Sequence, residues 1–83
     1  MNYSVIWVPS AEDQLAAIWI ASVRQAAVTA AADRIDQLLG TAPNGVGESR
    51  ADGYRVLIDL PLVAYYQVAD AERLVRVLRV IGR

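Results

Sequence analysis

Three short β-rich segments follow one another near the end of the chain, and this feature limits the fold most. They are YRVLIDL (residues 54–60), LVAYYQV (62–68) and RLVRVLRVI (73–81), separated only by Pro61 and by a turn that begins at Asp70. Short connections of this kind join neighbouring antiparallel strands, because a parallel pair needs a crossover of a dozen or more residues. The pattern therefore predicts a three-stranded antiparallel meander.

The first half of the chain predicts one strand and two helices. Residues 3–8 (YSVIWV) are rich in β-forming side chains and are followed by Pro9, which favours a strand that ends there. Two amphipathic helical patterns come next, the first from Ser10 to Ser22 and the second from Ser22 to Gly40. Each begins with a serine that can cap a helix, and Gly40 is a typical residue just past a helix end.

These elements predict a single α+β domain over residues 1–83. Because two amphipathic helices can cover one face of a sheet, we expect a mostly antiparallel four-stranded sheet with both helices on one face. Residues 41–53, rich in glycine and turn-forming residues, are expected to form a long loop. The expected core consists of large apolar side chains on the helical stripes and at alternate strand positions: Leu15, Ile18, Trp19, Val28, Ile35, Leu38, Val56, Ile58 and Val77.

Composition excludes several classes of function. The chain has neither cysteine nor histidine, so we expect no metal and no organic cofactor. The net charge is −1, which argues against a dedicated nucleic-acid binder. No apolar run approaches the roughly 20 residues that cross a bilayer, and no export signal is visible. We therefore expect a cytoplasmic protein that has no contact with a membrane.

Basic side chains are concentrated near the end of the chain, at Arg73, Arg76, Arg79 and Arg83. At period two, Arg76 and Arg79 fall on opposite faces of the last strand. These cations could bind phosphate or the carboxylates of a partner, or could keep an exposed strand from pairing with other chains. Both interpretations stay open.

Segments spread over nearly the whole chain resemble the RelE/ParE superfamily, the toxins of type II toxin–antitoxin (plasmid stabilisation) systems. In order they are YSVIWVPSAEDQLAAIW, AADRIDQLL before Pro43, GESR (47–50), GYRVL (53–57), PLVAYYQV (61–68) and VRVLRV (75–80). The resemblance implies a RelE/ParE-like fold and a cognate antitoxin as partner. It also implies that the protein assembles either as a dimer of the toxin or as a hetero-oligomer of toxin and antitoxin.

The superfamily has two branches with different activities. RelE-like members are ribosome-dependent messenger RNA endonucleases that use basic residues of the central strands, whereas ParE-like members lack that set and poison DNA gyrase. In this sequence Arg55 matches a basic position of the ribonuclease branch, but Leu57 and Val63 stand at two others. The resemblance thus implies a ParE-like toxin that binds DNA gyrase and is not an enzyme.

Two alternatives to this interpretation remain. One is a ribonuclease with a non-standard set, in which Glu48, Arg55 and Arg79 are the candidate catalytic residues and the ribosome with its messenger RNA is the partner. The other is a degenerate family member without toxicity. Glu48 is the one candidate base, because arginine stays protonated near neutrality.

The candidate contacts to a target or antitoxin are basic or aromatic side chains of the long loop and the strands: Arg50, Arg55, Tyr66, Arg76, Arg79 and Arg83. Two of them also have local explanations. Arg50 could pair with Glu48, and Arg55 could pair with Asp59 on the same strand face.

Overall fold

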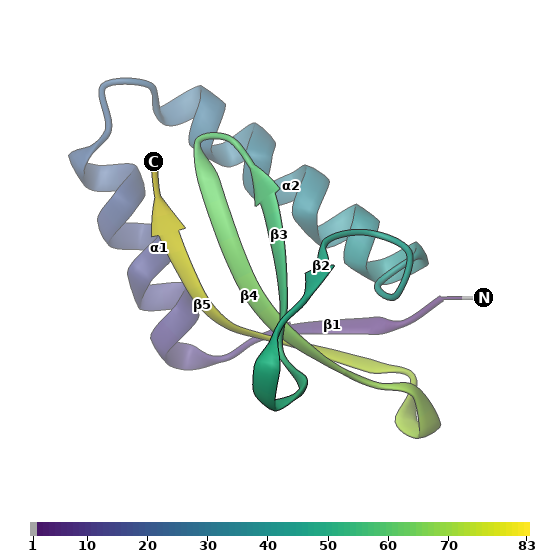
Figure 1. Ribbon diagram of the computed structural model, residues 1–83. Helices are drawn as coiled ribbons and strands as arrows, with labels where there is room; N and C mark the ends of the chain where they lie inside the picture. Colours follow the sequence, from purple (N-terminus) through teal and green to yellow (C-terminus); the bar gives the residue numbers. More distant parts are fainter. Residues whose placement is uncertain (1) are drawn as a thin grey trace.

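The computed structural model describes residues 2–83, which form two helices and a five-stranded mixed sheet (Figure 1). The elements are β1 (Ser4–Trp7), α1 (Pro9–Ala21), α2 (Gln25–Thr41), β2 (Glu48–Ser49), β3 (Arg55–Asp59), β4 (Leu62–Ala69) and β5 (Leu74–Gly82). The strand order is β1-β5-β4-β3-β2, and only β1 and β5 are parallel. The α+β class and the C-terminal meander are confirmed.

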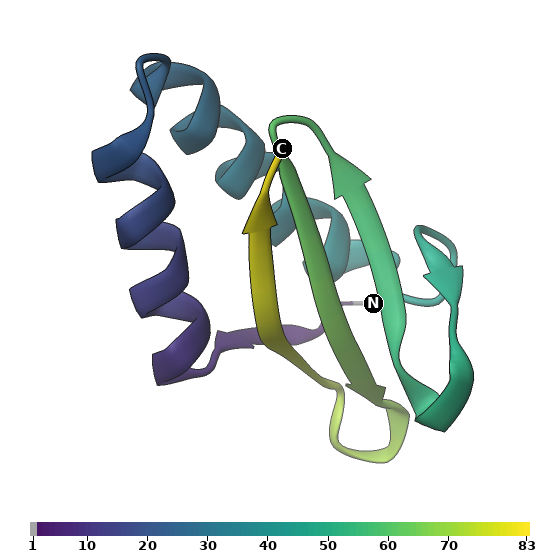
Figure 2. The same ribbon diagram turned by 60° about the vertical axis from the view of Figure 1, so that its left-hand side comes forward.

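The fifth strand lies in the segment that was expected to be a loop. Glu48 and Ser49 pair with Val56 and Arg55, so β2 forms a short edge beside β3. Both helices pack on the same face of the sheet, as expected (Figure 2). None of the helices in residues 2–83 has the length and apolarity needed to span a membrane.

The helix ends differ from the prediction. The first helix begins at Pro9, one residue before Ser10, because proline is well tolerated in the first turn. The second begins only at Gln25, since the hydroxyl of Ser22 accepts a hydrogen bond from the Arg24 amide in the turn between the helices (2.9 Å). Gly40 lies within α2, where its carbonyl accepts a hydrogen bond from the Tyr3 amide (2.7 Å).

The core lies between the helices and the sheet. Val28, Ile35 and Val77 lie in this core as expected, and Leu15 and Ile18 are partly buried against it. Val56 is buried as expected too, but on the other face of the sheet. The largest fully buried side chains come from α2, β4, β5 and the loop after α2: Tyr66, Ile35, Leu39, Leu62, Val28, Val75, Val77 and Pro43.

Three predicted core residues are exposed instead. Ile58 is 58% exposed because β3 turns Leu57 toward the helices and Ile58 toward the opposite side. Leu38 is 37% exposed because the buried stripe of α2 continues through Leu39. Trp19 is 42% exposed because it borders a groove between the two helices.

Candidate functional site

A β-bulge interrupts the last strand. Tyr65 of β4 pairs with Arg79 of β5, but the next residue, Tyr66, pairs with Val77, so Leu78 is passed over in the register. One extra residue of this kind reverses the alternation of side chains beyond it. The residues after Leu78 therefore face the sides opposite to those that strict alternation predicts.

The bulge places Arg76 and Arg79 on the same face, and the prediction that they lie on opposite faces is wrong. Arg76 pairs with Gln67 of β4 and with Ile6 of β1, whereas Arg79 pairs with Tyr65. Paired residues share a face, and Tyr65 and Gln67 are two residues apart on one strand. All five side chains therefore point away from the helices. We call this surface the arginine face.

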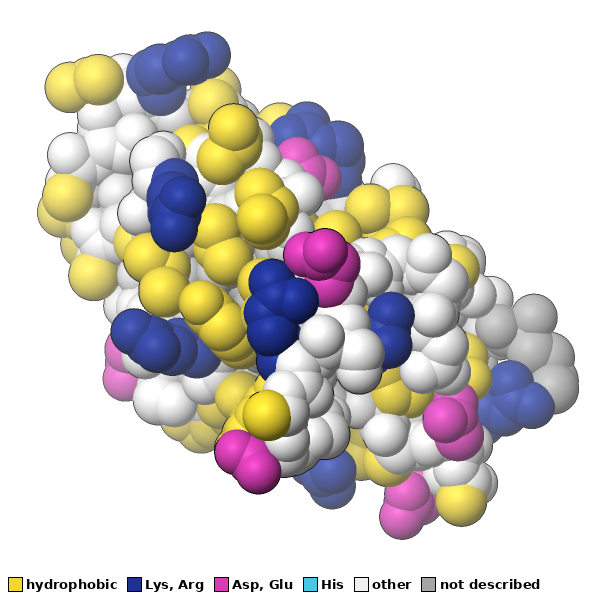
Figure 3. Space-filling model, in the orientation of Figure 1, with side chains coloured by type: hydrophobic (Ala, Val, Ile, Leu, Met, Phe, Trp, Pro, Cys, Tyr) yellow, Lys and Arg dark blue, Asp and Glu magenta, His cyan; other side chains and the backbone are white. Residues whose placement is uncertain are grey.

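The arginine face is basic and partly apolar. Arg76 and Arg79 are exposed, and neither forms an ion pair with residues 2–83. The guanidinium of Arg79 lies 5.5 Å from the centre of the Tyr65 ring, and Ile6 is 47% exposed beside Arg76. Figure 3 looks onto the sheet and shows hydrophobic side chains gathered there with basic side chains among them. No acidic residue occurs in β1, β4 or β5.

Tyr66 holds the loop that follows α2. Its ring is 0% exposed, and its hydroxyl lies 2.9 Å from the carbonyl oxygens of both Pro43 and Val46. The Nε of Arg55 donates to that hydroxyl (3.3 Å), while its Nη2 donates to the carbonyls of Val46 (3.1 Å) and Asn44 (3.3 Å). We call this cluster the loop tether. Tyr66 therefore has no exposed surface with which to contact a partner, contrary to the expectation, whereas its neighbour Tyr65 is half-buried on the arginine face.

Two ion pairs settle the local alternatives. Arg50 pairs with Glu48 at 3.2 Å, as one interpretation predicted, and both side chains are exposed. The expected pair of Arg55 with Asp59 is wrong, because Asp59 accepts two hydrogen bonds from the Nε and one from the Nη2 of Arg34 on α2. Arg55 is thus free to hold the loop tether.

The candidate catalytic residues do not come together. Arg55 points to the helix side of the sheet, whereas Arg79 points to the other side. Glu48 lies on β2, three strand steps from β5, which is roughly 14 Å at the usual strand spacing. In residues 2–83 no three side chains of the metal-binding types lie close enough to hold an ion.

Arg83 is exposed one residue beyond β5, and its amide donates to the Pro61 carbonyl (2.8 Å).

A polar cluster joins β1, the loop after α2 and the turn after β4. The Tyr3 hydroxyl and the Asn44 Nδ2 both donate to the Oδ1 of Asp70, at 2.7 and 2.8 Å. The hydrogen bond from Tyr3, followed by that from Asn44, lowers the pKa of Asp70. The same bond raises the pKa of Tyr3. The guanidinium of Arg73 lies 5.4 Å from the centre of the Tyr3 ring.

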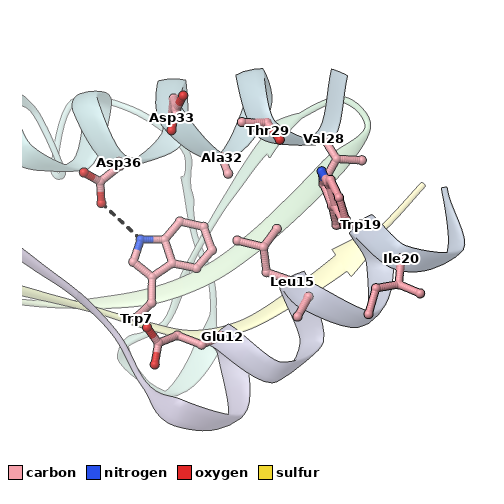
Figure 4. Close-up of a pocket in the computed structure, with 11 residues that line it drawn as sticks. Trp7, Glu12, Leu15, Trp19, Ile20, Val28, Thr29, Ala32, Asp33 and Asp36 are labelled. Atoms are coloured by element: carbon pink, nitrogen blue, oxygen red, sulfur yellow. Dashed lines mark hydrogen bonds between the residues drawn. The ribbon is translucent and has the colours of Figure 1, made fainter. Parts of the chain in front are cut away.

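A groove of 730 Å³ separates α1 from α2 (Figure 4). Its walls are mainly apolar, and three carboxylates border it. The Nε1 of Trp7, at its base, donates to the Oδ1 of Asp36 (3.1 Å). Sequence patterns missed this groove, because they placed Trp19 in the core. The lining residues are Trp7, Glu12, Leu15, Ala16, Trp19, Ile20, Val28, Thr29, Ala32, Asp33 and Asp36.

Two solved structures have the same fold. The toxin–antitoxin complex RelBE2 from Mycobacterium tuberculosis contains a chain that matches with a TM-score of 0.83 and 21% identity, over 100% of this chain and 93% of that one. The chromosomal ParDE system from P. aeruginosa matches with a TM-score of 0.76 and 23% identity, over 98% of this chain and 96% of that one. A comparison with curated proteins finds no match.

The sequence itself identifies the family. The family model of the ParE toxin of type II toxin–antitoxin systems matches residues 5–83, which is nearly the whole chain. The protein therefore belongs to the ParE toxin family of type II toxin–antitoxin systems.

Proposed function

We propose that this toxin arrests growth by binding DNA gyrase and that a cognate antitoxin neutralises it. Membership of the ParE family supports a toxin, and both similar structures belong to toxin–antitoxin systems. The observation that carries the choice of binding over RNA cleavage is the dispersal of Glu48, Arg55 and Arg79 over different strands and faces.

Cleavage of RNA through its 2′-hydroxyl needs one group to accept a proton and another to protonate the leaving oxygen, both near one phosphate. Glu48 forms an ion pair with Arg50 at the sheet edge. The guanidinium of Arg55 donates its hydrogen bonds within the loop tether. Arg79 has free N–H groups but remains protonated, so it could stabilise charge without acting as a base. The exposed arginines Arg76 and Arg79 serve recognition better than proton transfer, and Arg50 and Arg83 are further proposed contacts.

Induced expression without an antitoxin tests this function. We expect growth arrest with DNA breaks, and we expect the purified protein to inhibit supercoiling by purified gyrase. The Glu48→Gln variant should inhibit gyrase as well as the unchanged protein does, because Glu48 has no catalytic role in this proposal.

Primer extension on a reporter transcript tests the alternative function, cleavage of messenger RNA. Cuts at defined codon positions that disappear in Glu48→Gln would overturn the proposal and favour a ribonuclease. Normal growth together with unimpaired gyrase would also overturn it and favour a family member without toxicity.

A further inference from the structure

We propose that this chain forms a two-fold symmetric dimer, in which each copy places the turn between its helices against the acidic end of the other copy's groove. The groove is the hollow between α1 and α2, and the turn consists of residues 22–24. The occupant of the groove is thus a second copy of this chain. The contact belongs to the helical layer, whereas the arginine face lies on the other side of the sheet.

Apolar side chains are exposed together at the end of the helical hairpin. Val23 is 100% exposed, Ile20 is 73% exposed and Trp19 is 42% exposed. All three lie within residues 19–23, where α1 ends and the turn begins. Single exposed apolar residues are common on protein surfaces, but a group of large ones indicates a surface that a partner covers.

The two ends of the groove differ in chemistry (Figure 4). Trp19 and Ile20 line the end next to the turn, whereas Glu12, Asp36 and the indole of Trp7 lie at the other end. Among residues 2–83, none of those that line the groove is basic. An occupant that reaches the acidic end therefore needs a cation, and it needs apolar side chains beside that cation to cover the walls.

The turn between the helices supplies both kinds of group. Arg24 directly follows the exposed Val23, and its guanidinium forms no ion pair with residues 2–83. Arginine is favoured at contacts where a cation meets carboxylates and the face of an aromatic ring. Glu12, Asp36 and Trp7 offer these partners, and the Glu12 carboxylate also forms no ion pair within the described residues.

Two-fold symmetry lets two copies make this contact twice. The helix α1 has 13 residues and is about 20 Å long at a rise of 1.5 Å per residue. Ala16 lines the groove near the middle of α1, where a small side chain permits close approach. Arg24 lies just past the end of α1 and Trp7 just before its start, so an axis near Ala16 sets each turn opposite the other copy's Trp7.

Sedimentation equilibrium of the purified chain measures this association. We expect a dimer with twice the 9.0 kDa mass of the chain, and we expect its dissociation constant to rise as salt is added. Arg24→Glu and Glu12→Arg each set like charges against one another at both contacts, so each should raise the dissociation constant about tenfold or more. Arg76→Glu makes the same change of charge on the arginine face and should leave the constant almost unchanged.

A mixture of the two charge variants gives the sharpest test. In the mixed dimer, the glutamate introduced by Arg24→Glu faces the arginine introduced by Glu12→Arg, and the second contact keeps the original pair of Arg24 with Glu12. Both contacts are then attractive. We therefore expect the mixture to form a heterodimer with about the affinity of the unchanged protein, although each variant alone associates weakly. Both positions are exposed, and thermal unfolding checks that each variant is folded.

Val23→Ser tests the apolar part of the contact without any change of charge, and it should raise the dissociation constant about tenfold. A monomer at every protein concentration would overturn the inference, and so would an equal loss of affinity in Arg76→Glu. A dimer that withstands Arg24→Glu, Glu12→Arg and Val23→Ser would overturn it in favour of another surface. Failure of the mixed charge variants to associate would exclude this symmetric arrangement.

Discussion

Gly47 offers a sharp test of the loop tether. Its φ is +70°, and a Cβ at this position would lie 2.7 Å from the carbonyl oxygen of Val56 and 2.8 Å from the hydroxyl of Tyr66. Contacts this short require something to move. The Val56 carbonyl belongs to the backbone of β3, which is paired on both sides, so the loop has to yield instead of the strand.

The expected cost of Gly47→Ala has two parts. A side chain with a Cβ in the left-handed region costs about 1–2 kcal/mol. Movement of the loop would also separate the buried Tyr66 hydroxyl from the carbonyls of Pro43 and Val46, and an unsatisfied buried polar group costs about 1–3 kcal/mol. Together they predict a loss of about 2–5 kcal/mol, a large share of the roughly 5–15 kcal/mol that stabilises a small domain.

Urea unfolding followed by tryptophan fluorescence measures this loss, and Gly53→Ala is its matched control. Gly53 has a similar φ of +77°, but a Cβ there would meet no atom within 4 Å. Gly53→Ala should therefore cost only the backbone strain, about 1–2 kcal/mol. If the two variants lose the same free energy of unfolding, the argument from the clash and the tether is refuted.

Three further predictions follow from the same structure. Tyr66→Phe should lower the free energy of unfolding by about 1–3 kcal/mol in urea, because carbonyls of the loop lose their donor; an unchanged stability would contradict the tether. Asp70 has a lowered pKa, so its ionised form stabilises the fold above the usual pKa of 3.8, and this stabilisation is lost as the pH falls through the lowered pKa. The melting temperature of Asp70→Asn should therefore lie below that of the unchanged protein at neutral pH and approach it in acid, whereas a constant difference would contradict the assignment. Deletion of Leu78 removes the bulge and leaves Arg76 and Arg79 on one face by simple alternation, so this variant should unfold cooperatively on heating, whereas deletion of Val75 should not.

The sequence predicts the architecture where local patterns decide it. Short connections between β-rich segments require an antiparallel meander, and the apolar stripe around Ile35 requires that α2 cover the sheet. The short strand β2 could not be predicted, because Glu48 and Ser49 have no strand pattern of their own. They become a strand only through pairing with β3, which is a tertiary interaction.

The facing of β3 illustrates a second limit. One face of β3 carries Val56 and Ile58. The other face carries Leu57 between the charged residues Arg55 and Asp59. Apolar content alone therefore favours the first face for the core. The structure turns the second face toward the helices, because partners from distant segments satisfy the charges. Asp59 pairs with Arg34 of α2, and Arg55 binds the loop after that helix. Sequence patterns on one strand hold no information about such partners.

The facing of β5 was within reach of physical reasoning. Strict alternation would place either Arg76 or Arg79 beneath the helices, and burial of an unpaired charge is costly. A bulge between the two arginines removes that cost and still buries Val75, Val77 and Val80. Two charges three residues apart, in a strand that is otherwise apolar and covered on one face, therefore indicate a bulge.

The bulge occurs where β5 loses its neighbour. β1 ends at Trp7, opposite Val77, and beyond that point the Val80 amide donates to the Oε1 of Gln14 on α1 (2.9 Å). Beyond Val77, β5 is therefore paired with β4 on one side only, and its other side meets a side chain of α1. The register of such a strand is less constrained than that of a strand with hydrogen-bonded neighbours on both sides. The same irregularity that keeps both arginines out of the core gathers them on one surface, and this connects the energetics of burial with the partner that the surface is proposed to bind.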